Sequence, residues 1–246
     1  MSSEHAEAFM LASDAVYDEC QAGIATLDKI IVSCSSLYTN QARNALVPAL
    51  YAYWERFFRV IFAEFLHCAS VGSRPLHELN HNLGRLRLRR ELETRAHTRD
   101  DLLRGLQTIS GAQPPPLAEA RKLLASARDT LHEIEQLCDA PLSFVDPETW
   151  IVTESNVRFE VIERNCKRLG LDVRRLKSLL EESQIFLHPS LKDLVDTRNG
   201  IAHGDSITPL QPERWEALRS FTLSLMNATQ LFLLEAISDD GYLLAS

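Results

Sequence analysis

The segment from Gln41 to Ala69 constrains the fold most. Large apolar side chains recur in it at steps of three or four residues: Leu46, Leu50, Tyr53, Phe57, Ile61 and Phe65. Further apolar side chains fall on the other faces of the same helix: Val47, Trp54, Phe58, Val60 and Phe62. A helix that is apolar nearly all round is buried, either at the centre of a bundle or at a subunit interface.

Helical periodicity continues along the rest of the chain, and no convincing pair of alternating strands interrupts it. We predict helices over 12–37, 41–69, 117–138, 156–170 and 173–184, from His188 into the segment TRNGIAHGD, and after Pro212. The breaks are expected at Gly72–Pro75 and Pro114–Pro116, because proline disrupts a helix interior. Asn156 is the expected N-cap and Gly170 the expected stop of one helix. A short extended piece is expected at Thr149–Thr153.

The predicted fold class is therefore an all-α helical bundle with an inserted helical middle section. We expect a single domain over residues 1–246, in which residues 70–150 are an elaboration of unknown role. No run approaches the ~18 apolar residues that span a bilayer, and the acidic N-terminus lacks a basic n-region. The five cysteines are scattered and never form CxxC, which is typical of a reduced compartment. A cytoplasmic protein without membrane association is expected.

Basic residues cluster in two stretches, although the net charge of −8 argues against nonspecific coating of nucleic acid. Residues 74–104 hold eight arginines against five acids, and residues 158–177 hold seven bases against three acids. Such stretches are either solvated helix faces or a local track for phosphate groups. The candidate RNA contacts within them are Arg85, Arg87, Arg89, Arg90, Arg164, Lys167 and Arg168.

Arg198 and His203 lie at the end of a predicted helix, just before the long last helix. The pair is chemically suited to cutting RNA, which carries its own nucleophile in the 2′-hydroxyl group. Histidine titrates near neutral pH and can transfer the protons, and a guanidinium matches the oxygens of a phosphoryl group. The structural alternative is that Arg198 and Asn199 cap the helix while His203 packs as a polar residue.

The spacing of the pair raises a geometric problem. On a regular helix, five residues turn the chain by 500°, which leaves the two side chains about 140° apart. Arg198 and His203 converge if the backbone distorts near Asn199 and Gly200, if the arginine side chain wraps around the helix, or if a second subunit completes the site. We favour the last two routes.

Two segments resemble a known family. LVDTRNGIAHGD (194–205) looks like the RN-x-IAHG signature of the HEPN superfamily. SNVRFEVIERNCKRLGLD (155–172) resembles the helix ahead of that signature in HEPN-like nucleases that are often encoded beside restriction-type defence genes. The resemblance covers residues 155–238 well, and the buried helix with Tyr53-Trp54-Glu55-Arg56 fits an early family helix less specifically.

The resemblance implies a bundle that forms a homodimer and brings two Arg/His pairs into one cleft. It also implies cleavage of RNA without metal or cofactor, with Arg198, Asn199 and His203 as the functional set. Asp205, a candidate supporting residue, departs from the tyrosine that family members paired with nucleotidyltransferases often carry, which argues against tyrosine modification by such a partner. A further implication is an effector role in defence or in a toxin–antitoxin system, with an antitoxin or restriction-type partner protein. The alternative is a non-catalytic HEPN module that binds RNA or a protein.

Glu55 is an unusual acid within the apolar segment. A buried carboxylate needs a partner. Glu55 is therefore expected either to orient a site arginine or to form a local pair with Arg59.

The sequence HELNH at His77–His81 competes with this interpretation. On a helix, HExxH places two imidazoles on one face for zinc, with the glutamate, here Glu78, as general base, and Asp100 or Asp101 would offer a third ligand. The neighbouring arginines are unfavourable beside a zinc ion, and a zincin's substrate-binding strand is not predicted. A zinc hydrolase is therefore the third hypothesis, behind the ribonuclease and the binding module.

Overall fold

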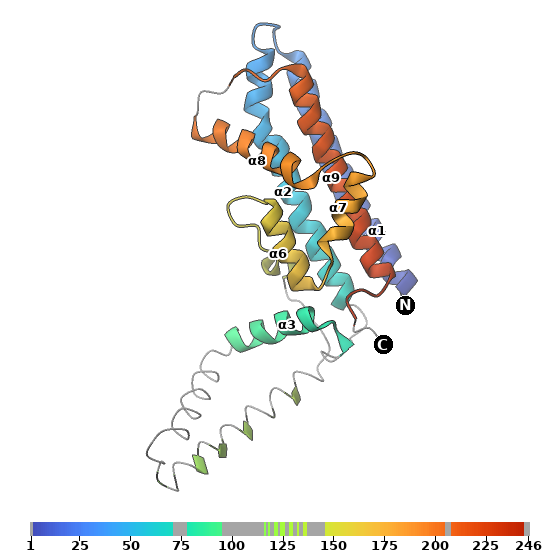
Figure 1. Cartoon of the computed structure of the whole chain (residues 1–246), viewed down its shortest axis with the longest axis vertical. Coiled ribbons are helices and arrows are strands. Elements are labelled where there is room, and N and C mark those ends of the chain that lie inside the picture. Colours follow the sequence, from blue (N-terminus) through green and yellow to red (C-terminus); the bar gives the residue numbers. More distant parts are fainter. Residues whose placement is uncertain are drawn as a thin grey trace. The chain divides into compact units, whose positions relative to one another are not determined.

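A computed structural model of the chain describes residues 2–70, 78–94, 146–204 and 208–243, with isolated positions between 116 and 136 (Figure 1). The helices are α1 (Ser2–Ser33), α2 (Thr39–Ser70), α3 (His81–Thr94), the 3-10 helix η2 (Pro147–Trp150), α6 (Phe159–Leu169), α7 (Val173–Glu181), α8 (Leu187–His203) and α9 (Pro212–Ser238). These described residues contain no β-sheet, and only an isolated bridge joins Leu79 to Leu243. The predicted all-α fold is confirmed.

The chain divides into two compact units. The first comprises Met1–Ala69 and Phe144–Gly241, and it contains every described helix except α3. The second comprises Ser70–Ser143 and Tyr242–Ser246. In the described parts of both units, no helix has the length and apolar character that a membrane crossing requires.

Helix α2 supplies much of the core of the first unit. Its fully buried side chains include a run of large aromatic residues: Trp54, Phe57, Phe58, Phe62 and Phe65. The rings of Phe58 and Phe62 lie 4.5 Å apart, centroid to centroid. Burial of each such side chain contributes about 1.5–3 kcal/mol relative to leaving it exposed. The predicted buried helix over residues 41–69 is thus confirmed.

Helices α1 and α9 run antiparallel beside one another in this unit (Figure 1). Two polar contacts fix their register. Trp215 Nε1 donates a hydrogen bond to Asp28 Oδ1 at 2.8 Å, and Gln230 Nε2 donates one to Asp14 Oδ1 at 2.6 Å. Because the two contacts lie about four turns apart on each helix, they resist both sliding and rotation.

The shorter helices α6, α7 and α8 pack against one another, and α7 and α8 also pack against α9. Helix α6 ends at Gly170, whose φ of 76° lies in the left-handed region that suits glycine, as predicted. Asp172 caps α7 by accepting a hydrogen bond from the Arg174 amide. The predicted helix over 173–184 ends earlier, at Glu181, and Gln184 then adopts a left-handed φ of 58°.

Several other local predictions are wrong. The first helix begins at Ser2 instead of residue 12 and ends at Ser33 instead of residue 37; its early turns are ordered by tertiary packing, which buries Phe9. Asn156 does not cap α6: Arg158 occupies the N-cap position, and the buried Oδ1 atom of Asn156 has no hydrogen-bond partner within the described ranges. The extended piece is also shorter than expected, since residues 147–150 form η2.

Candidate active site

Helix α8 carries all three residues of the candidate catalytic set. It remains α-helical from Leu187 through Gly200 to His203 and ends at Gly204, whose φ is 73°. The backbone distortion near Asn199 and Gly200 that we considered is therefore absent from α8. Its buried side chains are Leu187, Leu191, Leu194 and Val195.

This regular geometry sends Arg198 and His203 in different directions. At 100° per residue, Arg198 projects between the directions of the fully buried Leu191 and Leu194. His203 projects about 140° away from Arg198 and is exposed at the end of the helix. The arginine thus faces the interior of the unit, whereas the histidine faces solvent.

The guanidinium of Arg198 has two defined neighbours. Its Cζ atom lies 5.4 Å from the centroid of the Tyr51 ring on α2. Its Nη1 atom donates a hydrogen bond to Asn199 Oδ1 at 2.9 Å. A cation over an aromatic face is attracted by the ring quadrupole. Together, the two contacts hold a half-buried guanidinium in one orientation.

Tyr51 connects this arginine to the rest of the fold. The ring is buried, and its hydroxyl accepts a hydrogen bond from the Val157 amide, which lies just before α6. Burial raises the pKa of Tyr51, and the nearby carboxylate of Glu55 adds to the rise. These effects outweigh the lowering by the Val157 amide and by Arg198. The phenol therefore stays protonated at neutral pH while its oxygen accepts the hydrogen bond from Val157.

Glu55 lies one turn after Tyr51 on α2 and is half-buried. Arg59, which we considered as its local partner, instead pairs with Glu148 at 3.0 Å. Glu55 lies near Tyr51, whose pKa its charge helps to raise.

Asn199 joins Arg198 to the face of α8 that carries His203. Measured around the helix from His188, Asn199 lies at about 20°, Lys192 at about 40° and His203 at about 60°. These four side chains form a polar stripe beside the buried face of α8. Since Asn199 accepts the hydrogen bond from Arg198, it brings the guanidinium toward this stripe.

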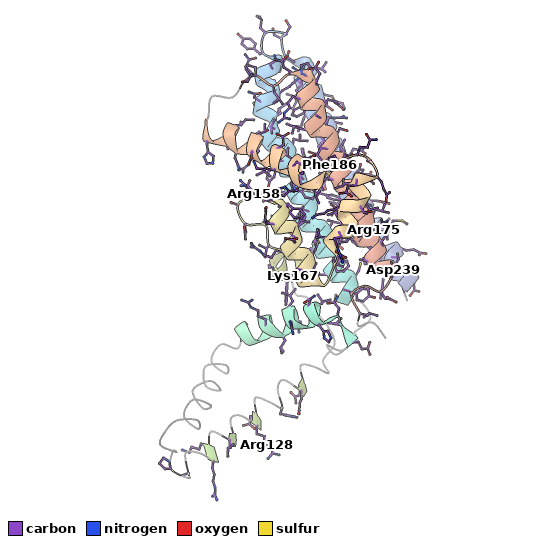
Figure 2. The ribbon with its side chains drawn as sticks, in the orientation of Figure 1. Arg128, Arg158, Lys167, Arg175, Phe186 and Asp239 are labelled. Atoms are coloured by element: carbon purple, nitrogen blue, oxygen red, sulfur yellow. The ribbon has the colours of Figure 1, made fainter. Side chains whose placement is uncertain are left out.

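The candidate RNA-contact residues are dispersed over helices α3 and α6. Arg164 pairs with Glu154, and Figure 2 shows Arg158 and Lys167 at opposite ends of α6. The remaining candidates with described side chains are Arg168 on α6, and Arg85, Arg87 and Arg89 on α3 of the second unit. Asp205 and the side chain of Arg90 lie outside the described residues.

The described part of the HELNH segment, residues 78–81, is not the continuous α-helix that a zinc motif needs. Helix α3 begins only at His81, and Asn80 accepts a hydrogen bond from the Leu83 amide at 2.9 Å, as a capping residue does. Glu78 therefore precedes the helix, and His77, Asp100 and Asp101 lie outside the described residues. The described ranges contain no group of three potential metal ligands.

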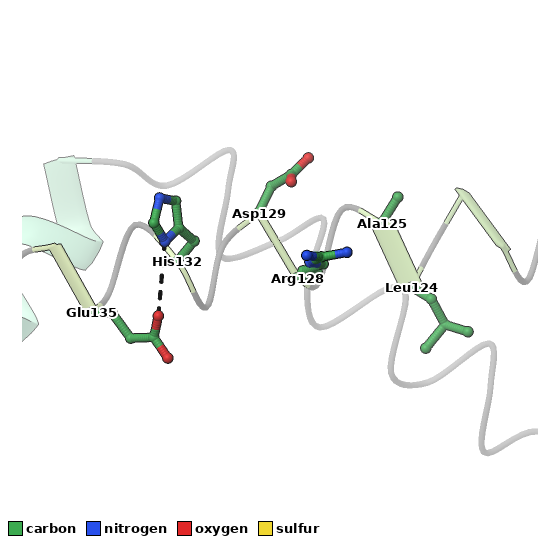
Figure 3. A pocket seen from close by; sticks show the side chains of 6 residues that line it. All are labelled: Leu124, Ala125, Arg128, Asp129, His132 and Glu135. Carbon is green, nitrogen blue, oxygen red and sulfur yellow. Dashed lines mark ion pairs between the residues drawn. The ribbon is translucent and has the colours of Figure 1, made fainter.

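A separate pocket of about 810 Å³ in the second unit is lined by Leu124, Ala125, Arg128, Asp129, His132 and Glu135 (Figure 3). His132 Nδ1 lies 3.8 Å from Glu135 Oε2, and both side chains are more than two-thirds exposed. This exposed pair lies on one helical turn. Its geometry gives no reason to prefer it to the set on α8.

Two features of the site escaped the sequence analysis. Tyr51 looked like an ordinary core residue, and its partner Val157 lies 106 residues away, so no local pattern reveals the contact. His188 and Lys192 were recognisable in principle, because they share the helical face of Asn199 and His203 at spacings near multiples of one turn.

The family model described as RiboL-PSP-HEPN matches residues 24–235. No curated protein and no solved structure matches the chain. The matched range includes all of α2, α6, α7 and α8, and therefore Tyr51, Arg198, Asn199 and His203. A HEPN domain indicates a nuclease or an RNA-binding module. The chain belongs to the HEPN family.

Proposed function

We propose that this protein is a metal-independent endoribonuclease whose catalytic residues are Arg198, Asn199 and His203. The observation that carries the proposal is the fixed guanidinium of Arg198, held between Tyr51 and Asn199 on the helix that presents His203. A positioned cation that needs no reorganisation stabilises charge as it develops in a transition state. The family match, which covers this whole arrangement, adds support.

In the proposed reaction, the 2′-hydroxyl oxygen of RNA attacks the adjacent phosphorus and loses its proton. The bond between phosphorus and the 5′ oxygen breaks, and that oxygen takes up a proton. The products are a 2′,3′-cyclic phosphate and a 5′-hydroxyl. His203 transfers protons, whereas Arg198 stabilises the negative charge on the non-bridging oxygens. Asn199 orients the guanidinium and donates its amide protons to the phosphate.

The exposed position of His203 fits a site that a second copy of the chain completes. We infer a two-fold homodimer in which Arg198 of one protomer and His203 of the other face the same phosphate. In a two-fold interface each contact occurs twice, so such a dimer would contain two composite sites. By analogy with the family, we infer an effector role in defence or in a toxin–antitoxin system, with a protein partner that restrains it.

The proposal is tested by incubating the purified protein with pooled tRNA and total RNA in excess EDTA, followed by identification of the new ends. Cleavage that leaves 2′,3′-cyclic phosphates and 5′-hydroxyls is expected. Tight RNA binding without cleavage by the wild-type protein would instead establish the non-catalytic HEPN module. Cleavage only after metal addition would contradict the proposed chemistry.

A further inference from the structure

A small pocket of about 110 Å³ lies in the first unit, between the start of α6 and the first half of α8. Its lining residues are Arg158, Phe159, Glu160, His188 and Lys192. Phe159 forms a firm wall, because its ring meets the His188 ring edge-on at 5.4 Å and Lys177 Nζ lies 4.4 Å from its centroid. The pocket therefore combines a fixed aromatic side chain with several nitrogen donors.

Two permanent cations and two carboxylates border this pocket, but they are paired unevenly. Arg158 Nη2 lies 3.8 Å from Asp196 Oδ1, and Lys192 forms an ion pair with the same carboxylate. One acid thus serves two permanent cations. His188 Nε2 lies 3.6 Å from Glu160 Oε1. A guanidinium has five N–H donors and an ammonium has three, so most of the donors of Arg158 and Lys192 stay available to a further anion.

The three nitrogen-bearing side chains remain accessible to a ligand. The side chains of Arg158, His188 and Lys192 are 47%, 55% and 62% exposed. Arg158 at the start of α6 is visible next to α8 in Figure 2. The nitrogen atoms of the three side chains can therefore be reached from solvent.

The pocket is also aligned with the candidate active site. His188 and Lys192 belong to the polar stripe that continues along α8 to Asn199 and His203. At 1.5 Å per residue, Lys192 lies about 10 Å from Asn199 along the helix axis, and the stripe extends about 22 Å from His188 to His203. An RNA strand that follows this face would bring the phosphate at the active site and a phosphate a few nucleotides away into contact with α8 together.

We propose that Arg158, His188 and Lys192 form a phosphate-binding subsite, which holds the RNA backbone a few nucleotides from the bond that is cut. This inference rests on the proposed ribonuclease function and specifies how its substrate is held. A forked guanidinium beside an ammonium suits the non-bridging oxygens of a phosphodiester. The alignment with His203 favours a nucleic acid over an acidic protein, because a nucleic acid has regularly spaced phosphates that can lie along the polar stripe.

The test uses full-length protein carrying His203→Ala, so that RNA is bound without being cut. Affinity for a fluorescent single-stranded oligonucleotide is measured by anisotropy at several salt concentrations. In this background, Arg158→Gln combined with Lys192→Gln is expected to weaken binding by about 10-fold or more. Loss of two phosphate contacts should reduce the slope of log K against log salt by about 1.4.

Asp196→Asn gives a prediction of the opposite sign. It removes the carboxylate that competes for Arg158 and Lys192, so RNA should bind more tightly. A gain in affinity cannot result from misfolding. The matched control is Lys29→Gln with Arg174→Gln, which removes the same charge from exposed sites on α1 and α7 and should change the salt slope less.

The possible results separate the two proposals. If the wild-type protein cleaves RNA but the Arg158/Lys192 variant binds it with unchanged affinity and salt slope, the subsite is wrong and the ribonuclease stands. If Asp196→Asn weakens binding, the subsite is also wrong. If the wild-type protein neither binds nor cleaves RNA, both the subsite and the ribonuclease fail.

Discussion

The guanidinium carbon of Arg198 lies 5.4 Å from the centre of the Tyr51 ring, which joins the candidate catalytic helix α8 to the central helix α2. The same tyrosine accepts a hydrogen bond from the Val157 amide just before α6. Three segments therefore meet at one buried side chain. The orientation of Arg198 depends on the packing of the core and not on α8 alone.

Tyr51→Phe tests the structural role of this hydroxyl. The variant keeps the ring below Arg198 but leaves the Val157 amide without its acceptor. Loss of that hydrogen bond should lower the free energy of unfolding by about 1–3 kcal/mol, measured by urea denaturation. Tyr53→Phe is the matched control, since it removes a hydroxyl from the same helix at a side chain that packs against Gly23. Equal free energies of unfolding for the two variants would contradict the structural role of the Tyr51 hydroxyl.

Asn199→Asp separates the two tasks that we assign to Asn199. Aspartate can still accept the hydrogen bond from Arg198, but it cannot donate to phosphate and it adds negative charge beside the RNA backbone. We expect the kcat/KM for RNA cleavage to fall by about 10-fold to 100-fold. Asn199→Ala should also lose activity, because the guanidinium loses its anchor. Wild-type activity in the aspartate variant would show that Asn199 only positions Arg198.

The ion pair between α7 and α9 predicts a pH dependence of stability. Arg175 donates to both carboxylate oxygens of Glu235, at 2.8 Å and 2.6 Å, and these hydrogen bonds hold the pKa of Glu235 below its usual value of 4.5. A lowered folded-state pKa means that the stabilisation is complete above pH 4.5 and is lost as pH falls through the folded-state value.

Glu235→Gln should therefore destabilise the protein slightly at neutral pH, and the difference from wild type should shrink in acid. Thermal unfolding at a series of pH values measures this difference. In an Arg175→Ala background, the same substitution should have almost no effect, because the partner is already absent. An acid-induced widening of the difference would mean that the pKa shift has the wrong sign.

Mixing two inactive variants tests the composite site. A heterodimer of Arg198→Ala and His203→Ala retains one intact site if each site takes its arginine and histidine from different protomers. After subunit exchange, half of the dimers are mixed, so about a quarter of wild-type activity should return. If both residues act within one protomer, every site in the mixture is damaged and no activity returns.

The sequence predicted α2 well because its apolar period extends over many turns. Predicted bounds of 41–69 compare with observed bounds of Thr39–Ser70. The stop at Gly170 was also predictable, since a left-handed residue after a helix favours glycine. Asn156 was wrongly predicted as the N-cap, because α6 begins at Phe159 and Arg158 occupies the N-cap position.

The candidate site was predictable only in part. Arg198, Asn199 and His203 stand together in a recognisable segment, and the helical spacing correctly indicates that Arg198 and His203 diverge on α8. The support from Tyr51 depends on tertiary contacts across more than a hundred residues. The partner of Arg59 shows the same limitation, because Glu148 lies far along the chain whereas Glu55 was the obvious local choice.

The most direct test of the central claim is the rate of RNA cleavage in excess EDTA by the wild-type protein and by His203→Ala, with His132→Ala in the second unit as the control. We expect the wild-type and His132→Ala proteins to cut RNA at the same rate. We also expect kcat/KM for His203→Ala to fall by about 10²–10⁴-fold with unchanged folding and dimerisation. Cleavage by His203→Ala at the wild-type rate would contradict the account.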